Sequence, residues 1–270
     1  MTMKIAFIGG GNMGEAMLAA VLEKRLAAPA DIAVSDVSEP RRDFLKKQYG
    51  IAVTAESRDA VAGKDVVVLA VKPQNVPEVL AGLKGCIKPS QLVLSIAAGV
   101  SIDTISRGLA HDSVVRAMPN TPAQVGFGMS GWTAAAAVAP VQKRQAQTVL
   151  AAMGAEIYFA VEALLDAVTA VSGSGPAYFF LFAESLIDSA VEIGLSRPDA
   201  ENLVRQTMLG SAQLLLKSGK SPAELRRAVT SKGGTTERAL NVFEEGGFAG
   251  LVSAAVRAAH LRAQELGQKT

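Results

Sequence analysis

The chain has 270 residues, of which 49% are hydrophobic and 19% charged, with a formal net charge of +2 at pH 7. This composition indicates one large or two ordinary globular domains rather than a disordered chain, and no apolar run reaches the ~18 residues of a membrane span. One cysteine, Cys86, and two isolated histidines exclude an internal disulfide and a cluster with metal-site spacing, and the scattered basic pairs do not form the stripe of a nucleic-acid binder.

The first predicted element is a buried strand at residues 5–8, which runs directly into a glycine-rich turn. Gly9, Gly11 and Gly14 have the G-x-G-x-x-G spacing of a dinucleotide-binding turn. The first glycine allows the tight turn, the second lets a pyrophosphate approach the backbone, and the third lets the next helix pack closely. That helix is predicted from residue 12 to about 26, and its free N–H groups at Asn12, Met13 and Gly14 would hold the phosphates. A strand so near the N-terminus leaves no room for a signal peptide, so a cytoplasmic location is expected.

A second strand, predicted at residues 31–37, bears on the choice of cofactor. Asp36 at its end lies where an acidic residue accepts hydrogen bonds from an adenosine ribose. Arg41 and Arg42 follow it, and guanidinium groups there would instead hold a 2′-phosphate. The sequence therefore predicts NADPH or NADH as cofactor and does not choose between them.

Strands and helices continue to alternate up to residue 161. Strands are predicted at 51–54, 65–71, 91–98, 113–118, 126–133 and 155–160. Helices are predicted at 38–49, 75–84 and 140–153, and a further helix is predicted to begin near Ser101, which would be its N-cap. Ligands bind at the carboxyl ends of the strands in a doubly wound sheet. The residues expected there, in addition to the glycine turn, are Ala70, Val71, Lys72, Pro73, Ala97, Ala98 and Asn120. For Asn120, which stands between two prolines, an ordinary turn is the alternative.

From residue 162 onward the periodicity is helical only. Helices are predicted at 162–171, 176–194, 198–218, 221–229, 235–245 and 248–267. We therefore expect an α/β chain with a Rossmann-like doubly wound sheet domain at 1–161, followed by an all-helical domain at 162–270. The break at 172–176 is explained by a helix start, with Ser174 as N-cap and Pro176 near the first helical position.

A second glycine-rich break, Ser231-Lys232-Gly233-Gly234-Thr235-Thr236, precedes a later helix. It offers backbone N–H groups unhindered by side chains at a helix N-terminus, together with three hydroxyls. This combination suits a small carboxylate beside a polar ligand atom. Helix capping is the alternative explanation for one of the threonines.

Six segments together resemble the signature set of pyrroline-5-carboxylate reductases and occur in the order of that family. They are residues 8–14 (IGGGNMG), 70–73 (AVKP), 95–99 (SIAAG), 118–122 (MPNTP), 171–178 (VSGSGPAY) and 230–236 (TSKGGTT). The last two are the most specific. Two positions depart from the pattern: Lys232 stands where many members have proline, and Asp36 ends a strand that has no acid there in some relatives.

The resemblance implies NAD(P)H-dependent reduction of the cyclic imine 1-pyrroline-5-carboxylate to L-proline. It implies that the substrate carboxylate binds the backbone N–H groups of Ser231, Gly233, Gly234 and Thr235, and that the Thr236 hydroxyl holds the ring nitrogen for hydride attack. Lys72 would line the cofactor site rather than act as a general acid. In similar enzymes the helical domains of two subunits interlock as a homodimer, and a decamer built as a ring of dimers also occurs.

Two other functions are weighed against this one. A β-hydroxyacid dehydrogenase would carry a catalytic lysine in the helix after the first glycine-rich break, where this chain has none in residues 176–182. A non-catalytic dinucleotide-binding regulator would keep the first glycine turn but would have no need for the segment from Gly233 to Thr236.

Overall fold

The computed structural model describes residues 2–268. The described chain forms two compact units: one contains the residues up to Ser174 together with those from Ala258 onward, and the other is Gly175–Arg257.

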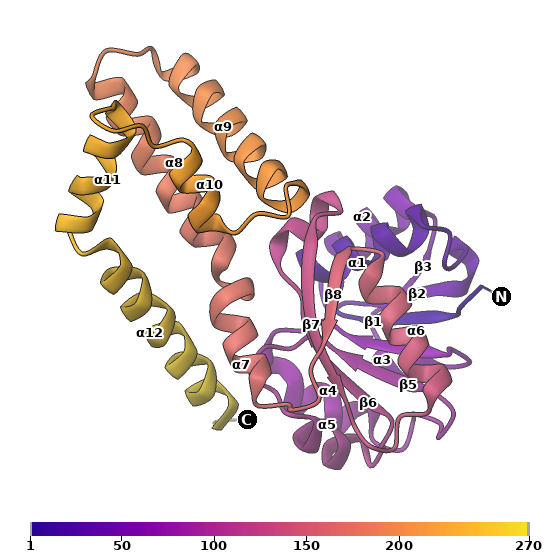
Figure 1. The fold of residues 1–270 in the computed structure, drawn as a ribbon. Coiled ribbons are helices and arrows are strands. Elements are labelled where there is room, and N and C mark those ends of the chain that lie inside the picture. Colours follow the sequence, from indigo (N-terminus) through magenta and orange to yellow (C-terminus); the bar gives the residue numbers. More distant parts are fainter. Residues whose placement is uncertain (1, 269–270) are drawn as a thin grey trace. The chain divides into compact units, whose positions relative to one another are not determined.

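The first unit is built on one eight-stranded sheet (Figure 1). Its strands are β1 (Ile5–Ile8), β2 (Ile32–Ser35), β3 (Ala52–Thr54), β4 (Val66–Leu69), β5 (Leu92–Ser95), β6 (Val114–Met118), β7 (Gly128–Ala134) and β8 (Gly154–Tyr158). Their order is β3-β2-β1-β4-β5-β6-β7-β8. All neighbours are parallel except β6 and β7, which are antiparallel.

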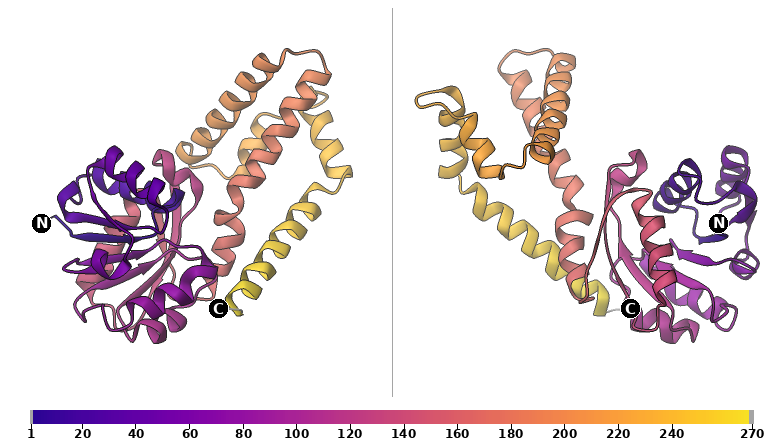
Figure 2. Two further views of the ribbon diagram at one scale, coloured as in Figure 1. Left: turned by 180° about the vertical axis from the view of Figure 1, so that it is seen from behind. Right: turned by 45° about the vertical axis from the view of Figure 1, so that its right-hand side comes forward.

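Helices cover both faces of this sheet (Figure 2). On one face, Ile5 and Phe7 pack in a core shared with α1 (Asn12–Glu23), α2 (Glu39–Tyr49) and α6 (Pro140–Ala151). On the other, Ala6 and Ile8 pack with α3 (Ser57–Val61), α4 (Val76–Leu83) and α5 (Ile102–Leu109). Because successive side chains of a strand point to opposite faces, a strand covered on both sides must be apolar throughout, as β1 is. Full burial of one such large side chain stabilises the fold by roughly 1.5–3 kcal/mol.

The predicted doubly wound α/β sheet is confirmed. Each predicted strand is present, and Ser101 caps α5 by accepting a hydrogen bond from the Thr104 N–H at 3.1 Å. Helix α3 and the short 3-10 helices Pro29–Asp31, Pro73–Asn75 and Thr121–Val125 were not predicted. With three to five residues each, these segments are too short to show a helical period.

The helical part of the chain begins with consecutive helical segments, where the sequence predicts two helices separated by a break. Helix α7 (Leu164–Val168) passes into a π-helical turn (Thr169–Gly173) and then into α8 (Gly175–Glu192). The Ser174 N–H donates to the Thr169 carbonyl at 2.8 Å, and its backbone is helical at φ −83° and ψ −22°. The prediction that Ser174 is an N-cap was therefore wrong, because an N-cap has an extended backbone.

The second unit is helical. It contains α8, α9 (Arg197–Lys217), α10 (Pro222–Ala228), α11 (Thr235–Glu245) and the first part of α12 (Phe248–Gln268), whose last residues belong to the first unit. No helix in the described part of the chain is both long enough and apolar enough to cross a bilayer.

A buried ion-pair cluster holds α7 and the residues before it against the sheet. The Arg116 side chain on β6 is 8% exposed, and its guanidinium donates to Glu162 Oε1 and to Asp166 Oδ1, each at 3.1 Å. Glu162 Oε1 also accepts the Ile102 N–H at 2.8 Å. Arg116 therefore joins β6 to Glu162 and to Asp166 on α7, and Glu162 extends the cluster to the first turn of α5.

Candidate functional site

The structure brings all predicted cofactor residues of the first unit to one edge of the sheet. Strands β1, β2, β4, β5 and β6 are mutually parallel, so the segments that follow them leave the sheet on the same side. These segments hold Gly9, Gly11, Asn12, Met13 and Gly14 after β1, Asp36 after β2, Ala70 to Pro73 after β4, Ala97 and Ala98 after β5, and Asn120 after β6. The order changes direction between β1 and β4, which is the switch point where open α/β sheets bind ligands.

The three glycines of the turn have different surroundings. Gly9 has φ +96°, and a Cβ there would lie 2.7 Å from the Ala70 carbonyl oxygen. A Cβ on Gly14 would lie 2.5 Å from the Gly9 carbonyl oxygen. A Cβ on Gly11 would meet nothing within 4 Å. Gly9 and Gly14 are thus required by the fold, whereas Gly11 leaves open space over the turn.

The start of α1 faces that space with unpaired donors. Gly11 is the N-cap and has no side chain to offer, and the first intrahelical bond runs from the Glu15 N–H to the Gly11 carbonyl at 2.8 Å. Within residues 2–268 the N–H groups of Asn12, Met13 and Gly14 have no acceptor. Free donors at the positive end of a helix dipole fit a pyrophosphate, so the turn can hold a dinucleotide.

Asp36 is fixed beside this turn. Its Oδ2 accepts the Gly10 N–H at 2.8 Å, and its Oδ1 accepts the Ser38 N–H at 2.9 Å. These two bonds hold a half-buried carboxylate at the end of β2, where an adenosine ribose would lie.

The two arginines after Asp36 are both engaged inside the protein. Arg41 forms an ion pair with Glu15, donates to the Gly10 carbonyl, and lies 5.1 Å from the centroid of the Phe44 ring. Arg42 Nη1 donates to the carbonyl oxygens that follow β2, at 2.8 and 3.1 Å. Arg41 therefore braces the glycine turn rather than projecting a free guanidinium.

Glu15, which pairs with Arg41, has a second hydrogen-bond partner. Its Oε1 accepts the Tyr49 hydroxyl at 2.8 Å. Burial, and next the hydrogen bond to Glu15, raise the pKa of Tyr49 to about 12. The phenol therefore stays protonated and keeps donating over the whole physiological pH range.

The other predicted cofactor residues differ in exposure. Lys72 is exposed, Ala70, Val71, Pro73 and Ala98 are half-buried, and Ala97 is buried in the core beside α4 and α5. A contact from Ala97 to a ligand would have to come from its backbone.

Asn120 has internal partners on both sides of its amide. Its Nδ2 donates to the carbonyl and hydroxyl oxygens of Ser172 at 3.3 and 3.2 Å, and its Oδ1 accepts the Met129 N–H at 2.8 Å. The partners that hold the amide in place lie in β7 and in the π-helical turn.

The second glycine-rich segment lies in the other unit, at the start of α11. Gly233 has φ +74°, which only glycine adopts readily, and a Cβ on the N-cap Gly234 would overlap the Ser231 hydroxyl. The Gly234 N–H donates to the Ser231 carbonyl at 3.0 Å, and the Gly233 N–H donates to Glu237 Oε2 at 2.7 Å. Both glycine N–H groups expected to bind a ligand are therefore engaged within the loop.

The free donors at this helix start lie one to three residues further along. The first bond to the N-cap carbonyl comes from the Arg238 N–H at 3.3 Å, so the N–H groups of Thr235, Thr236 and Glu237 have no partner among the described residues. Sequence reasoning missed Glu237. An acid three residues after an N-cap is nevertheless a known signal for a side chain that folds back onto the loop.

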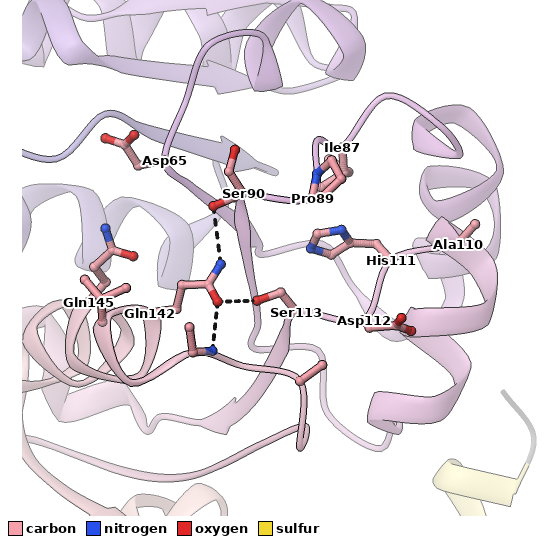
Figure 3. A pocket seen from close by; sticks show the side chains of 13 residues that line it. Asp65, Ile87, Pro89, Ser90, Ala110, His111, Asp112, Ser113, Gln142 and Gln145 are labelled. Carbon is pink, nitrogen blue, oxygen red and sulfur yellow. Dashed lines mark hydrogen bonds between the residues drawn. The ribbon is translucent and has the colours of Figure 1, made fainter.

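A surface cavity of about 600 Å³ lies at the opposite edge of the sheet (Figure 3). Its lining includes residues that precede β4, β5 and β6, among them Asp65, Ser90 and Ser113. Gln142 bridges this edge by accepting from the Ser113 hydroxyl at 2.8 Å and donating to the Ser90 carbonyl at 3.3 Å. The cavity therefore does not belong to the predicted cofactor edge.

Residues 2–268 contain no candidate metal site. No group of three or more His, Cys, Asp or Glu side chains in that range is arranged to hold a metal ion. His111 is buried, with Nε2 2.9 Å from the Gln91 carbonyl oxygen.

Two family models match the chain. The model for pyrroline-5-carboxylate reductase dimerisation matches residues 162–266, and the model for NADP oxidoreductase, coenzyme F420-dependent, matches residues 4–99. The first covers the start of α11 and the second covers the glycine turn.

Individual relatives match over nearly their whole length. The pyrroline-5-carboxylate reductase of Pseudomonas aeruginosa is 45% identical over 99% of this chain and 98% of its own. The structure of a pyrroline-5-carboxylate reductase from Coxiella burnetii has a TM-score of 0.91 at 40% identity, covering 98% of this chain and 99% of its own. The structure of Plasmodium falciparum pyrroline carboxylate reductase with NADP bound has a TM-score of 0.89 at 30% identity, covering 98% of both chains.

Proposed function

The chain belongs to the pyrroline-5-carboxylate reductase family, and we propose that it binds its dinucleotide at the glycine turn and its substrate at the start of α11. The reaction is NAD(P)H-dependent reduction of the C=N bond of 1-pyrroline-5-carboxylate, which gives L-proline. The observation that supports the cofactor site most directly is the surroundings of Gly11, where open space lies beside three N–H groups without an acceptor among the described residues.

The cofactor, when bound, supplies the hydride. The chain's part is to hold it: the N–H groups of Asn12, Met13 and Gly14 bind the pyrophosphate, and Asp36 lies beside the adenosine ribose. The segments Ala70–Pro73 and Ala97–Ala98 line the same edge. Asn120 contributes by bracing that edge through its bonds to Ser172 and Met129.

The substrate half is assigned to the α11 start. The substrate carboxylate binds the free N–H groups of Thr235, Thr236 and Glu237, at the positive end of the helix dipole. Ser231, Gly233 and Gly234 shape the loop, since both glycine N–H groups have partners within it. The Thr236 hydroxyl hydrogen-bonds the ring nitrogen and so fixes the direction of hydride attack.

No histidine lies in either of these loops. The ring nitrogen therefore receives its proton from water or arrives already protonated. Lys72, exposed after β4, lines the cofactor edge and is not assigned an acid role.

Self-association is supported by the match to the dimerisation model. We propose a homodimer formed through a helical domain at 162–270, which follows a dinucleotide-binding domain at 1–161 in the chain, and a decamer as a ring of such dimers. Exposed aromatic side chains on α8, including Phe179 and Phe180, each 65% exposed in the single chain, supply apolar surface for the dimer. We place the enzyme in the cytoplasm, where reduced nicotinamide cofactor is available. Mass measurement in solution and cell fractionation test these points.

The decisive experiment follows NADPH and NADH consumption with 1-pyrroline-5-carboxylate for the wild type, Thr236→Ala and Thr236→Ser. Wild-type turnover with either cofactor is expected, and its absence with both would overturn the assigned function. Thr236→Ala should lower kcat/KM at least tenfold, about 1.4 kcal/mol, while Thr236→Ser retains most of the activity. Unchanged kinetics in Thr236→Ala would remove this residue from its role and leave the reductase function standing.

A further inference from the structure

We propose that Glu237 positions the substrate loop through its hydrogen bond to Gly233 and that its negative charge limits the affinity for the substrate carboxylate. This inference rests on the proposed placement of that carboxylate at the start of α11. It assigns to one side chain two effects of opposite sign on substrate binding.

The positioning effect follows from the geometry of the loop. Glu237 Oε2 accepts the Gly233 N–H at 2.7 Å, from the first turn of the helix back onto the residue before the N-cap. Gly233 is in the left-handed region at φ +74°, and a Cβ on Gly234 would overlap the Ser231 hydroxyl oxygen, which would have to rotate away. The carboxylate therefore locks the peptide that leads into the helix and sets the direction of the next three N–H groups.

The hydrogen bond from the Gly233 N–H to Glu237 is stronger than one between neutral groups. A backbone N–H that donates to an ionised carboxylate makes a charge-assisted hydrogen bond, about twice as strong as a neutral one. Without this acceptor, the hydrogen bond that remains next to Gly233, among the residues that the structure describes, runs from the Gly234 N–H to the Ser231 carbonyl. Loss of the acceptor should therefore loosen the loop and weaken substrate binding.

The negative charge of Glu237 has the opposite effect, because it weakens binding of the substrate carboxylate. The N–H of Glu237 itself is one of the three free donors, so a bound substrate carboxylate would lie on the same helix turn as the Glu237 carboxylate. Two like charges at one helix N-terminus repel each other and compete for the same dipole. Glutamine at this position keeps an acceptor oxygen for Gly233 and removes the charge, so it separates the two effects.

The chain offers a matched control in the same unit. At the start of α10, Glu224 Oε2 accepts the Ser221 N–H at 2.8 Å and the Ser221 hydroxyl at 2.7 Å, which is a capping box. Like Glu237, it is an acid in the third helical position that folds back onto the preceding loop. It lies outside the proposed substrate loop.

The test compares wild type, Glu237→Ala, Glu237→Gln and Glu224→Ala. The readouts are KM for 1-pyrroline-5-carboxylate, competitive inhibition by L-proline, KM for the cofactor, and the melting temperature. Glu237→Ala should raise the substrate KM and the L-proline inhibition constant about tenfold while leaving the cofactor KM unchanged. Glu237→Gln should lower both substrate-side constants two- to threefold, roughly, because only the repulsion is lost. Glu224→Ala should lower the melting temperature and leave all three constants unchanged.

Several results would overturn the proposal. They are an unchanged substrate KM in Glu237→Ala, an equal rise in substrate KM in the Ala and Gln variants, or a comparable rise in Glu224→Ala. If Glu237→Ala does not fold, Glu237→Gln still decides, because a raised substrate KM there contradicts the charge effect. Wild-type turnover is measured first, so failure of the reductase function is recognised before any variant is compared.

Discussion

Replacing Gly11 with alanine separates cofactor binding from folding, because the glycine turn gives its three glycines different roles. Gly11 has an extended backbone at φ −65° and ψ −176°, which alanine adopts without strain. Apart from its two chain neighbours, no described residue would lie within 4 Å of the added Cβ. The added methyl group would instead occupy the space proposed for the pyrophosphate.

The expected magnitudes follow from these surroundings. In Gly11→Ala, the entropy lost by the unfolded chain favours folding by about 0.4–1 kcal/mol, and the poorer N-cap opposes it by a similar amount, so stability stays within about 0.5 kcal/mol of wild type. The methyl group should weaken cofactor binding at least tenfold, about 1.4 kcal/mol. In Gly14→Ala, the Cβ lies 2.5 Å from the Gly9 carbonyl oxygen. That overlap should cost a net ~1–2 kcal/mol, or roughly 2–8 °C in Tm.

The assay titrates each variant with NADPH and NADH by fluorescence and records thermal unfolding in parallel. Gly11→Ala should keep its Tm and lose affinity, and Gly14→Ala should lose Tm. Wild-type affinity for both cofactors in a folded Gly11→Ala would show that the pyrophosphate does not lie over this glycine and would refute the placement.

Three further predictions concern the edge of the sheet and its supports. Asp36→Ser should raise the ratio of NADPH to NADH affinity, since a carboxylate beside the ribose disfavours a 2′-phosphate; an unchanged ratio would mean that the ribose is recognised elsewhere. Arg116→Met should lower the free energy of unfolding by about 2–3 kcal/mol, because it leaves Glu162 and Asp166 without their buried cation. Arg107→Met, which removes an exposed ion pair, should lower it far less, and equal effects of the two substitutions in urea unfolding would contradict this account. Tyr49 has a folded-state pKa raised to about 12, so the stability that it contributes is full below pH 10 and is lost as the pH rises from 10 to 12. Tyr49→Phe should flatten the dependence of the free energy of unfolding on pH in this range, and an unchanged dependence would show that Tyr49 is not the group responsible.

Local patterns were sufficient for most of the fold. Short, fully apolar runs such as Val66–Leu69 predict strands buried on both faces, and glycines in the 9–14 turn mark both the turn and the helix start. Three features could not be predicted, because each depends on contacts with distant segments. They are the helices too short to show a helical period, the antiparallel pairing of β6 with β7, and the helical backbone at Ser174.

Residues that are adjacent in the chain were enough to predict the family, the order of the strands and of the longer helices, and the two glycine-rich helix starts. Which backbone N–H groups remain free depends instead on how the loops fold. Gly233 and Gly234 were expected to offer theirs, but the folded loop gives one to Glu237 and the other to Ser231. The tertiary structure also decided that Gly11, rather than Gly9 or Gly14, leaves space for a ligand. The physical reason is the same in both cases: a donor or an open space is defined by what the rest of the folded chain places next to it.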